Sequence, residues 1–564
     1  MKRLLIMLMI CLALASAAGA GDEYYDSQLN RGIRNDDTYA YALMKQADLN
    51  KQDAERLLKS AAGVSPNLPA VYFRLAAKTF SFSGGGLLKS VDYMVSGVHA
   101  YARNFWWSFT LAGAVYLSLV LSFIASYIVM LCVRSSSDIP MITHDIRETP
   151  SRAALLVVLL LLSALSPLLF IAGCLVLIGI YMKKTDRSVV YLFLLFLAFT
   201  PVLLSTASLF INAASSGKLK AVVQTNEFKG NTYALSALKD DPDFPSAFSY
   251  ALALKHEGRY PEAVALYQKL LDTAPDPRVM VNLGNCYVGF YNFEENKKAN
   301  LNDAAKYYTL SINTKPSASA YYNLSVVSRE LLEFEKGDEY FKAALNVDRV
   351  AVEKVSAVAS RNSNRFVIDD IISVDEFWAY ARARSTRVLT FGMTALPPLA
   401  LSLIAILLIP VFYLLPDRLR IFAYRCRKCN TILCNRCERE LVIGQICSQC
   451  YGSMIKLAEL DVKERVARIL SIYEQQKKRR DIMKILSFII PGTAHLYSGK
   501  ILYGFLMLWP FMFFILFPVV SSFFFPANHL ISHGFMNGVA LCCALLLYIS
   551  SNILTRQGIS KGWL

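Results

Sequence analysis

Long apolar runs constrain this chain more than any other feature of its sequence. A helix needs about 18 or more largely apolar residues to cross a bilayer. Six stretches meet that description: Phe105–Val133, Ala153–Met182, Val189–Asn212, Leu389–Leu415, Ile501–Phe525 and Phe535–Ile553. Ser166-Pro167 interrupts the second run and Pro397-Pro398 interrupts the fourth. Each interruption predicts a kinked span or, alternatively, a re-entrant hairpin.

The length of 564 residues exceeds what one hydrophobic core organises and allows several modules. The predicted fold class is mostly α: a helical membrane protein with an α-solenoid domain and a small zinc ribbon. The predicted modules are a signal peptide at 1–20, a helical soluble region at 21–104, three apolar membrane segments at 105–212, a repeat domain at 213–387, a span at 388–415, a zinc ribbon at 416–454, an amphipathic basic helix at 455–484 and a two-span module at 485–564.

The first twenty residues have the organisation of a secretory signal peptide. Lys2 and Arg3 precede the apolar run Leu4–Ala15, and Ala18-Gly19-Ala20 has the small-residue pattern of a cleavage site. The alternative is an uncleaved first anchor. The short signal and the set of modules favour a multi-pass protein of a bacterial inner membrane.

The soluble stretch between the third and fourth runs repeats itself. Its units contain YALALKHEGRYPEAVALYQKLLDTAP, then NLGNCYVGFYNFEENKKANLNDAAKYYTLSINTKP, then AYYNLSVVSRELLEFEKGDEYFKAALNVD. These units resemble tetratricopeptide repeats, helical hairpins of about 34 residues that must stack to bury their apolar faces. The matching residues are Tyr250, Ala251, Ala263, Tyr267 and Pro275; Leu283, Gly284, Tyr287, Ala304, Tyr308 and Pro316; and Tyr321, Leu324, Ser325, Phe341 and Ala344.

The resemblance implies a concave face that binds a helix or an extended peptide of a protein partner. Asn282, Asn285 and Asn323 fall on the first helices of their units, where their amides could bind a partner's backbone. The alternative is that these amides only face solvent. The full set of basic residues with which some family members bind a terminal carboxylate is missing.

Six of the twelve cysteines form three CxxC pairs: Cys426/Cys429, Cys434/Cys437 and Cys447/Cys450. A structural zinc ion takes four tetrahedral ligands, and each CxxC can supply two thiolates. The 17 residues between the outer pairs match a four-cysteine zinc site. Cys426, Cys429, Cys447 and Cys450 are therefore the predicted zinc ligands, and Cys434 and Cys437 are weaker candidates.

The stretch CRKCNTILCNRC with the later QICSQCY resembles the last part of a FYVE-type zinc finger, in which alternate pairs share a metal. The resemblance implies one zinc on the outer pairs. The pair that would complete a second site is missing, as is most of the family's basic lipid-binding motif. A plain zinc ribbon fits equally well. Three disulfides or a redox-active CxxC are the rival interpretations.

The net charge of +16 is concentrated near the cysteines. Between Pro416 and Lys484 there are 16 Lys and Arg against 8 Asp and Glu. Basic loops beside spans favour the cytoplasmic face, and zinc thiolates favour a reducing compartment. The ribbon and the C-terminus are therefore predicted to be cytoplasmic, with the lipid bilayer rather than nucleic acid as the partner of the basic block.

The C-terminal region begins with a predicted amphipathic helix over Ile455–Lys484, which ends in a basic collar. The following PGTAHLYSGK and its apolar helix resemble small bacterial two-span membrane modules. His495 is predicted to be a structural donor rather than a functional group.

The predicted topology contains a conflict. A cytoplasmic ribbon places the repeat domain outside, and a cleaved signal also places 21–104 outside. Three single spans between two outside regions have the wrong parity. Three solutions remain open: Ala153–Met182 is a hairpin that turns at Pro167, the signal is unusual, or the repeats are cytoplasmic and the ribbon external.

No Gly-rich phosphate loop, HExxH, nucleophile elbow or run of intramembrane acids is present, so an enzyme is not predicted. The favoured function is a membrane-anchored scaffold that recruits a protein through its repeats. The alternatives are a transport or channel component and an envelope thiol–disulfide protein.

Overall fold

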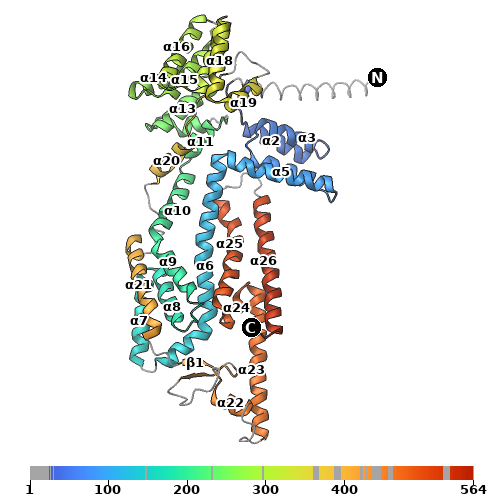
Figure 1. Cartoon of the computed structure of the whole chain (residues 1–564), viewed down its shortest axis with the longest axis vertical. Coiled ribbons are helices and arrows are strands. Elements are labelled where there is room, and N and C mark those ends of the chain that lie inside the picture. Colours follow the sequence, from blue (N-terminus) through green and yellow to red (C-terminus); the bar gives the residue numbers. More distant parts are fainter. Residues whose placement is uncertain are drawn as a thin grey trace. The chain divides into compact units, whose positions relative to one another are not determined.

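The structure is a computed structural model of the whole chain, and it is mostly helical (Figure 1). It describes residues 25, 27–29, 31–146, 149–229, 233–294, 297–359, 367–385, 396–418, 423–426, 428–434, 446–454, 462–524 and 534–562. The proposed signal peptide lies outside these residues. The chain divides into two compact units, of which the first holds Met1–Thr110, Leu209–Thr386 and Ala527–Ser532, and the second holds the rest.

The first unit is built from helices that precede and helices that follow the first membrane segments in the sequence. Its N-terminal helices are α2 (Asp37–Leu49), α3 (Ala54–Val64), α4 (Pro69–Thr79) and α5 (Gly84–Arg103). Its later elements are α11 (Lys218–Asn226), α12 (Tyr233–Ala237), α13 (Phe244–His256), α14 (Tyr260–Thr273), α15 (Pro277–Gly289), the π-helix η1 (Phe290–Glu294), α16 (Lys298–Thr314), α17 (Ala318–Glu330), α18 (Phe334–Val347), α19 (Arg349–Ala359) and α20 (Val374–Arg384).

Local signals account for where several of these helices begin. The Asp36 side chain caps α2 by accepting a hydrogen bond from Tyr39 N at 2.9 Å. Pro69 occupies the first turn of α4, where a missing N–H does no harm. Ser373 and Glu376 form a reciprocal capping box at the start of α20.

Helices α13 to α18 pack as three successive hairpins, each against the next. Small and aromatic residues fill the interior: Ala263, Tyr267, Ala304 and Tyr308 are all fully buried. A Cβ on Gly284 would come within 2.5 Å of the Tyr308 ring, so a small residue is needed for this close approach. The second hairpin is longer because η1 lengthens its turn.

A buried group of charges joins the N-terminal helices to the segment that follows α11. Lys229 Nζ lies 2.9 Å from Asp37 Oδ2 and 3.3 Å from Glu227 Oε2. Asn35 Nδ2 donates to the Glu227 backbone carbonyl at 2.7 Å. Because a lone buried charge is unfavourable, this closed set fixes how the two parts of the unit meet.

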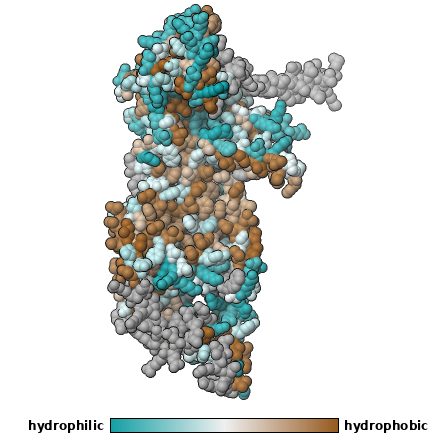
Figure 2. Space-filling view, viewed as in Figure 1, coloured by the Kyte–Doolittle hydropathy of each residue, from teal (hydrophilic) through white to brown (hydrophobic). Residues whose placement is uncertain are grey.

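The second unit holds the membrane helices and the cysteine-rich segment. Its elements are α6 (Phe105–Asp145) beyond Thr110, α7 (Thr149–Leu165), α8 (Pro167–Ile180), α9 (Ser188–Ala198), the first part of α10 (Thr200–Ser215), α21 (Pro398–Arg418), β1 (Ala423–Arg425), β2 (Ile432–Cys434), α22 (Ser448–Met454), α23 (Val462–Ile489), α24 (Thr493–Ser498), α25 (Ile501–Phe524) and α26 (Gly534–Ser560). Apolar side chains gather over its helices, as expected of a lipid-facing surface (Figure 2).

Three helices in the described part of the chain are long and apolar enough to cross a membrane: α6, α25 and α26. They confirm the first, fifth and sixth predicted spans. Helices α9 and α10 could together form a fourth span, although the pair is bent by 61°. The apolar part of α21, Pro398–Leu414, is shorter, and residues 389–395 of the fourth predicted run lie outside the described residues.

The second predicted run, Ala153–Met182, is not one continuous span. It forms two short helices, α7 and α8, which break at Ser166 and pack against each other. A Cβ on Gly173 of α8 would lie 2.8 Å from Leu162 Cδ1 and 3.5 Å from Leu159 Cδ2 of α7. Leu159 and Gly173 lie at equal distances in sequence before and after the break at Ser166. Their contact therefore shows that the chain folds back on itself. Pro167 explains the break, since proline opens a helix more readily than it continues one.

Candidate functional site

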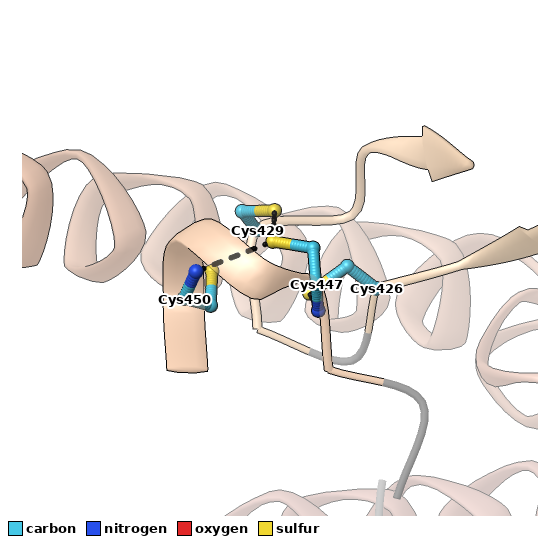
Figure 3. A group of neighbouring side chains, drawn as sticks. All are labelled: Cys426, Cys429, Cys447 and Cys450. Atoms are coloured by element: carbon cyan, nitrogen blue, oxygen red, sulfur yellow. Dashed lines mark hydrogen bonds between the residues drawn. The ribbon is translucent and has the colours of Figure 1, made fainter. Parts of the chain in front are cut away.

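The outer CxxC pairs meet in one cluster, carried by a small antiparallel hairpin and a short helix (Figure 3). Cys426 follows strand β1, and Cys429 lies in the turn that leads to β2. Asn430, with φ of 63°, closes that turn and donates its backbone N–H to the Cys426 carbonyl at 2.9 Å. Cys447 precedes α22, and Cys450 lies in its first turn. Local turn chemistry therefore presents two sulfurs from each pair to the same point.

The distances within this cluster suit four ligands of one metal ion. The four Sγ atoms all lie within 4.8 Å of one another, and Cys429 Sγ lies 3.7 Å from Cys447 Sγ. Zinc–sulfur bonds of about 2.3 Å in a tetrahedron would separate the sulfurs by roughly 3.8 Å. A disulfide would bring a pair to about 2.0 Å. None of the ten cysteines that the structure describes forms a disulfide, so the geometry fits a metal centre.

Backbone donors surround the sulfurs. The N–H of Cys447 points to Cys426 Sγ and the N–H of Cys450 points to Cys447 Sγ, each at 3.3 Å. Burial raises the pKa of Cys426, but the backbone N–H groups of Cys429, Cys447 and Lys428 outweigh it and lower the pKa to about 7. Burial raises the pKa of Cys447 to about 11 and also raises that of Cys450. A cation is the natural partner for thiolates packed this closely.

The cluster is also the core of its own small fold. Cys426, Cys447 and Cys450 are buried together with Ile472 of α23. Immediately before the first ligand, Arg425 donates a hydrogen bond to the Ser137 carbonyl of α6. A bound metal would therefore hold the hairpin, α22 and α23 together, which is what a structural site does.

The middle pair is separate from this cluster. Cys434 is buried at the end of β2, but it does not belong to the group of four. Cys437 lies outside the described residues. Among the residues that the structure describes, the cysteines that come together are therefore the four principal predicted ligands.

The three predicted partner-binding asparagines lie on the first helices of their hairpins, and all are buried. They bind backbone, but the backbone belongs to residues 367–372 of the same chain. Asn282 donates to the Asp370 carbonyl and accepts from the Asp370 N–H, both at 2.9 Å. Asn323 donates to the Ile368 carbonyl at 2.8 Å and accepts from its N–H at 2.7 Å. Solvent is therefore not what these amides face.

Asn285 connects these contacts. Its amide donates to the Ile368 carbonyl at 2.9 Å and to Asp369 Oδ1 at 2.7 Å. Its own oxygen accepts from Tyr308 Oη at 2.7 Å and from Asn323 Nδ2 at 2.9 Å. Every polar atom of the buried amide is thus used, which holds the side chain in one orientation.

A carboxylate subsite lies beside the asparagines. Lys255 Nζ lies 2.6 and 2.8 Å from the two carboxylate oxygens of Asp369, and His256 Nε2 lies 3.1 Å from Oδ2. All three side chains are buried. Burial alone would raise the pKa of Asp369, but Lys255 and His256 outweigh it and hold the pKa well below its usual value. Burial lowers the pKa of His256, although Asp369 opposes this.

Sequence reasoning missed several residues of this face: Asn226, Lys255, His256, Ser319 and Asp369. Asn226 accepts from the Ile372 N–H at 3.0 Å, and Ser319 donates to the Asp370 carboxylate. One available signal was the run VIDDIIS, which alternates neither as a helix nor as a half-buried strand yet is largely apolar. Another was the adjacent Lys255-His256 at the end of a first helix, where basic residues usually face solvent.

His495 lies in the short helix α24 and is buried, with its Nδ1 lacking a hydrogen-bond partner among the described residues. Burial and the nearby Lys500 lower its pKa to about 4. The imidazole is therefore neutral at pH 7. The predicted donor role at this nitrogen is not what the structure shows.

Comparison with models of known protein families and with curated proteins finds no match. The fold and the cysteine cluster alone therefore define the class: a mostly helical membrane protein with a candidate metal centre.

Proposed function

We propose that the protein is a membrane-anchored scaffold that recruits a protein partner by binding an extended segment of it. The observation that carries this proposal is the pair of bidentate contacts from Asn282 and Asn323 to a peptide backbone. Such contacts use only groups that every residue has. A face built in this way suits another chain as well as its own, and it resembles β-strand recognition in relying on main-chain hydrogen bonds.

The helical hairpins α13/α14, α15/α16 and α17/α18 are, in this proposal, tetratricopeptide repeats. The small residues Ala251, Ala263, Ala304 and Ala344 and the aromatic residues Tyr267 and Tyr308 at the matching positions are buried, as the repeat requires. The asparagines project from the first helix of a hairpin, which lines the concave face in this family. Helices α14, α16 and α18 then form the convex side.

Zinc is the proposed metal, in a structural role. Four thiolates in a tetrahedral arrangement are the ligand set that zinc prefers, and a fourth protein ligand leaves no open position for a substrate. When bound, the ion would supply cross-linking rather than catalysis. The rival thiol–disulfide function would need a pair of sulfurs placed to form a bond, whereas the four sulfurs here all lie within 4.8 Å of one another, with 3.7 Å between Cys429 Sγ and Cys447 Sγ.

The proposed topology resolves the parity conflict through the α7–α8 hairpin. The chain crosses on α6 and again on the bent α9–α10 pair, while α7 and α8 enter and leave the same face. The ion pair between Asp37 and Lys229 supports this, because residues before and after these helices belong to one compact unit. An even number of crossings must then separate them.

Helix α21 would cross next and place the cysteine cluster on the opposite side, and α25 and α26 would return the C-terminus to that side. The excess of Lys and Arg between Pro416 and Lys484 supports a cytoplasmic position for the cluster. The proposed location is a bacterial inner membrane, with the helical hairpins outside and the metal centre inside.

Site-specific photo-crosslinking in intact cells tests recruitment. A photoreactive amino acid replaces the partly exposed Ser317, whose hydroxyl lies 3.0 Å from that of Ser319 beside Asp370, and in a control replaces the exposed Leu310 of α16. We expect an adduct with another protein from position 317 alone, and mass spectrometry should place it in an extended segment of that partner. Adducts from both positions, or from neither, would contradict the proposal.

A further inference from the structure

The extended segment at residues 367–372 is held much as a separate peptide would be. Alternate residues are bound through the backbone: Ile368 by Asn323, Asp370 by Asn282 and Ile372 by Asn226. A period of two is the repeat of an extended chain. Side-chain amides from α11, α15 and α17 supply these hydrogen bonds, in place of a neighbouring strand. The helices therefore form a binding site for extended backbone.

At one position of the segment, Asp369, the helices contact the side chain. Asp369 is enclosed by the ammonium of Lys255, the ring of His256 and the amide of Asn285. On the remaining side lies Gly32, where a Cβ would meet Asp369 Oδ2 at 2.7 Å. A neutral side chain here would leave the buried Lys255 without a counter-charge, which is strongly unfavourable. The subsite therefore selects a carboxylate.

Apolar side chains flank that carboxylate. Ile372 is 1% exposed, and Ile368 packs against the cluster around Tyr322 and Val326. Val367 packs against the cluster around Tyr308. Ile371, in contrast, is 39% exposed and contributes little to selection. The face therefore specifies an extended peptide with a carboxylate one residue after an apolar side chain and three residues before another.

We infer that residues 367–372 are an internal stand-in for the partner's segment, and that the partner supplies an extended peptide of this apolar–acidic–apolar pattern which displaces them. This inference rests on the proposed recruitment function and specifies the ligand of the same face. A tethered segment competes at an effective concentration on the order of mM. The stand-in would thus exclude weak or mismatched peptides and admit those that reproduce the carboxylate contact.

The test uses the full-length protein in detergent and a fluorescent peptide of sequence VIDDIIS, followed by anisotropy. The replacement Asp369→Asn weakens the internal segment but leaves Lys255 and His256 in place. We expect this variant to bind the peptide at least tenfold more tightly than the wild type does. A peptide with asparagine at the first aspartate should bind the variant at least tenfold more weakly. Asp338→Asn, at an exposed ion pair with Arg329, is the matched control and should bind like the wild type.

A second measurement needs no variant. In wild-type protein, the amide hydrogens of Ile368, Asp370 and Ile372 should exchange with solvent faster than those in the middle of α15, because the segment opens without unfolding of the helices. Exchange at the α15 rate would overturn the inference. Equal peptide binding by wild type and Asp369→Asn, with both still folded, would also overturn it.

The outcomes separate this inference from the proposed function. Peptide displacement in vitro without a crosslinked partner in cells would show that the segment can be displaced, but it would remove the recruitment function and with it the partner that the inference requires. A partner crosslinked from position 317, with no displacement of the segment, would support recruitment and remove the inference.

Discussion

Lys255 and Asp369 form a buried ion pair across 114 residues of sequence, with Nζ at 2.6 and 2.8 Å from the two carboxylate oxygens. Both side chains are at most 6% exposed. Each of these buried charges is stabilised by the other, because removal of either side chain would leave an uncompensated charge in the interior. The contact therefore links the hairpins to the segment that lies on them.

A double-mutant cycle should reveal this dependence. Lys255→Met and Asp369→Asn should each lower the free energy of unfolding, and together they should lower it by less than the sum, with a coupling energy of about 1–3 kcal/mol. The control cycle uses Arg349 and Glu353, whose side chains are 78% and 58% exposed, and should give a much smaller coupling energy because solvent screens exposed charges. Equal coupling in the two cycles, measured by urea unfolding, would contradict this prediction.

The stability of the first unit should depend on the ionisation of Asp370. Burial raises the pKa of Asp370 to about 6, and the neighbouring Asp369 adds to this while the Ser319 hydroxyl opposes it. The folded protein therefore holds a proton that the unfolded chain releases at its ordinary pKa near 4. The stability from the protonated form is complete below pH 4 and is lost as the pH rises through 6.

Asp370→Asn imitates the protonated carboxyl and should remove this dependence. We expect the variant to unfold at a higher temperature than the wild type at pH 7, with the difference disappearing at pH 4. His256, whose pKa is lowered by burial, is present in both proteins, so its contribution cancels in the comparison. If the difference in melting temperature between the two proteins stays the same from pH 4 to pH 7, Asp370 is not the group that causes the pH dependence.

The sequence predicted the parts of this fold that depend on local pattern. The long apolar runs that begin at Phe105 and Ile501 form helices, because a segment that spans a bilayer must satisfy its own backbone hydrogen bonds. The spacing of Cys426, Cys429, Cys447 and Cys450 predicted which sulfurs meet, because each CxxC turn orients its own pair. For the run at Ala153, Pro167 indicated a disruption but did not distinguish a kink from a hairpin, since packing by Leu159 and Gly173 decides that.

The segment at residues 367–372 could not be predicted in this way. Its hydrogen-bonding partners, Asn226, Asn282 and Asn323, lie between 45 and 146 residues earlier in the chain. No local periodicity records such a contact. An aspartate in a short apolar run most often faces water, so only the folded arrangement of Lys255 and His256 shows that Asp369 is bound.

The metal content of the purified protein should depend on the four clustered cysteines and not on Cys434. Purified protein should contain about one zinc per chain. Cys447→Ser should lose most of it, because three ligands bind the ion far less tightly. Cys434→Ser is the matched control, since Cys434 is also buried near the hairpin but lies outside the group of four. Metal content is measured by elemental mass spectrometry. Equal loss of metal in both variants would assign Cys434 to the site.

A glycine contact fixes the turn before α24. Gly492 has φ of +82°, and a Cβ there would lie 2.3 Å from the Gly504 carbonyl oxygen. Backbone atoms cannot move aside as a flexible side chain can, so Gly492→Ala should lower the free energy of unfolding by about 1–3 kcal/mol. Gly538→Ala in α26 is the control, because nothing lies within 4 Å of its added Cβ. Similar melting temperatures for the two variants in detergent would contradict the close approach.

The proposed topology places both soluble parts of the first unit on the same side of the membrane. Protease recognition sites inserted at two exposed positions, Leu49 at the end of α2 and Leu332 after α17, report on those parts. A third site after Gly562 reports on the C-terminus. In spheroplasts treated with protease from outside, we expect cleavage at Leu49 and Leu332 and protection after Gly562, with cleavage there only after lysis. If the sites at Leu49 and Leu332 differ in accessibility, the number of crossings between them is odd. The α7–α8 pair would then have to cross the membrane, and the single compact unit joined by Asp37 and Lys229 could not form.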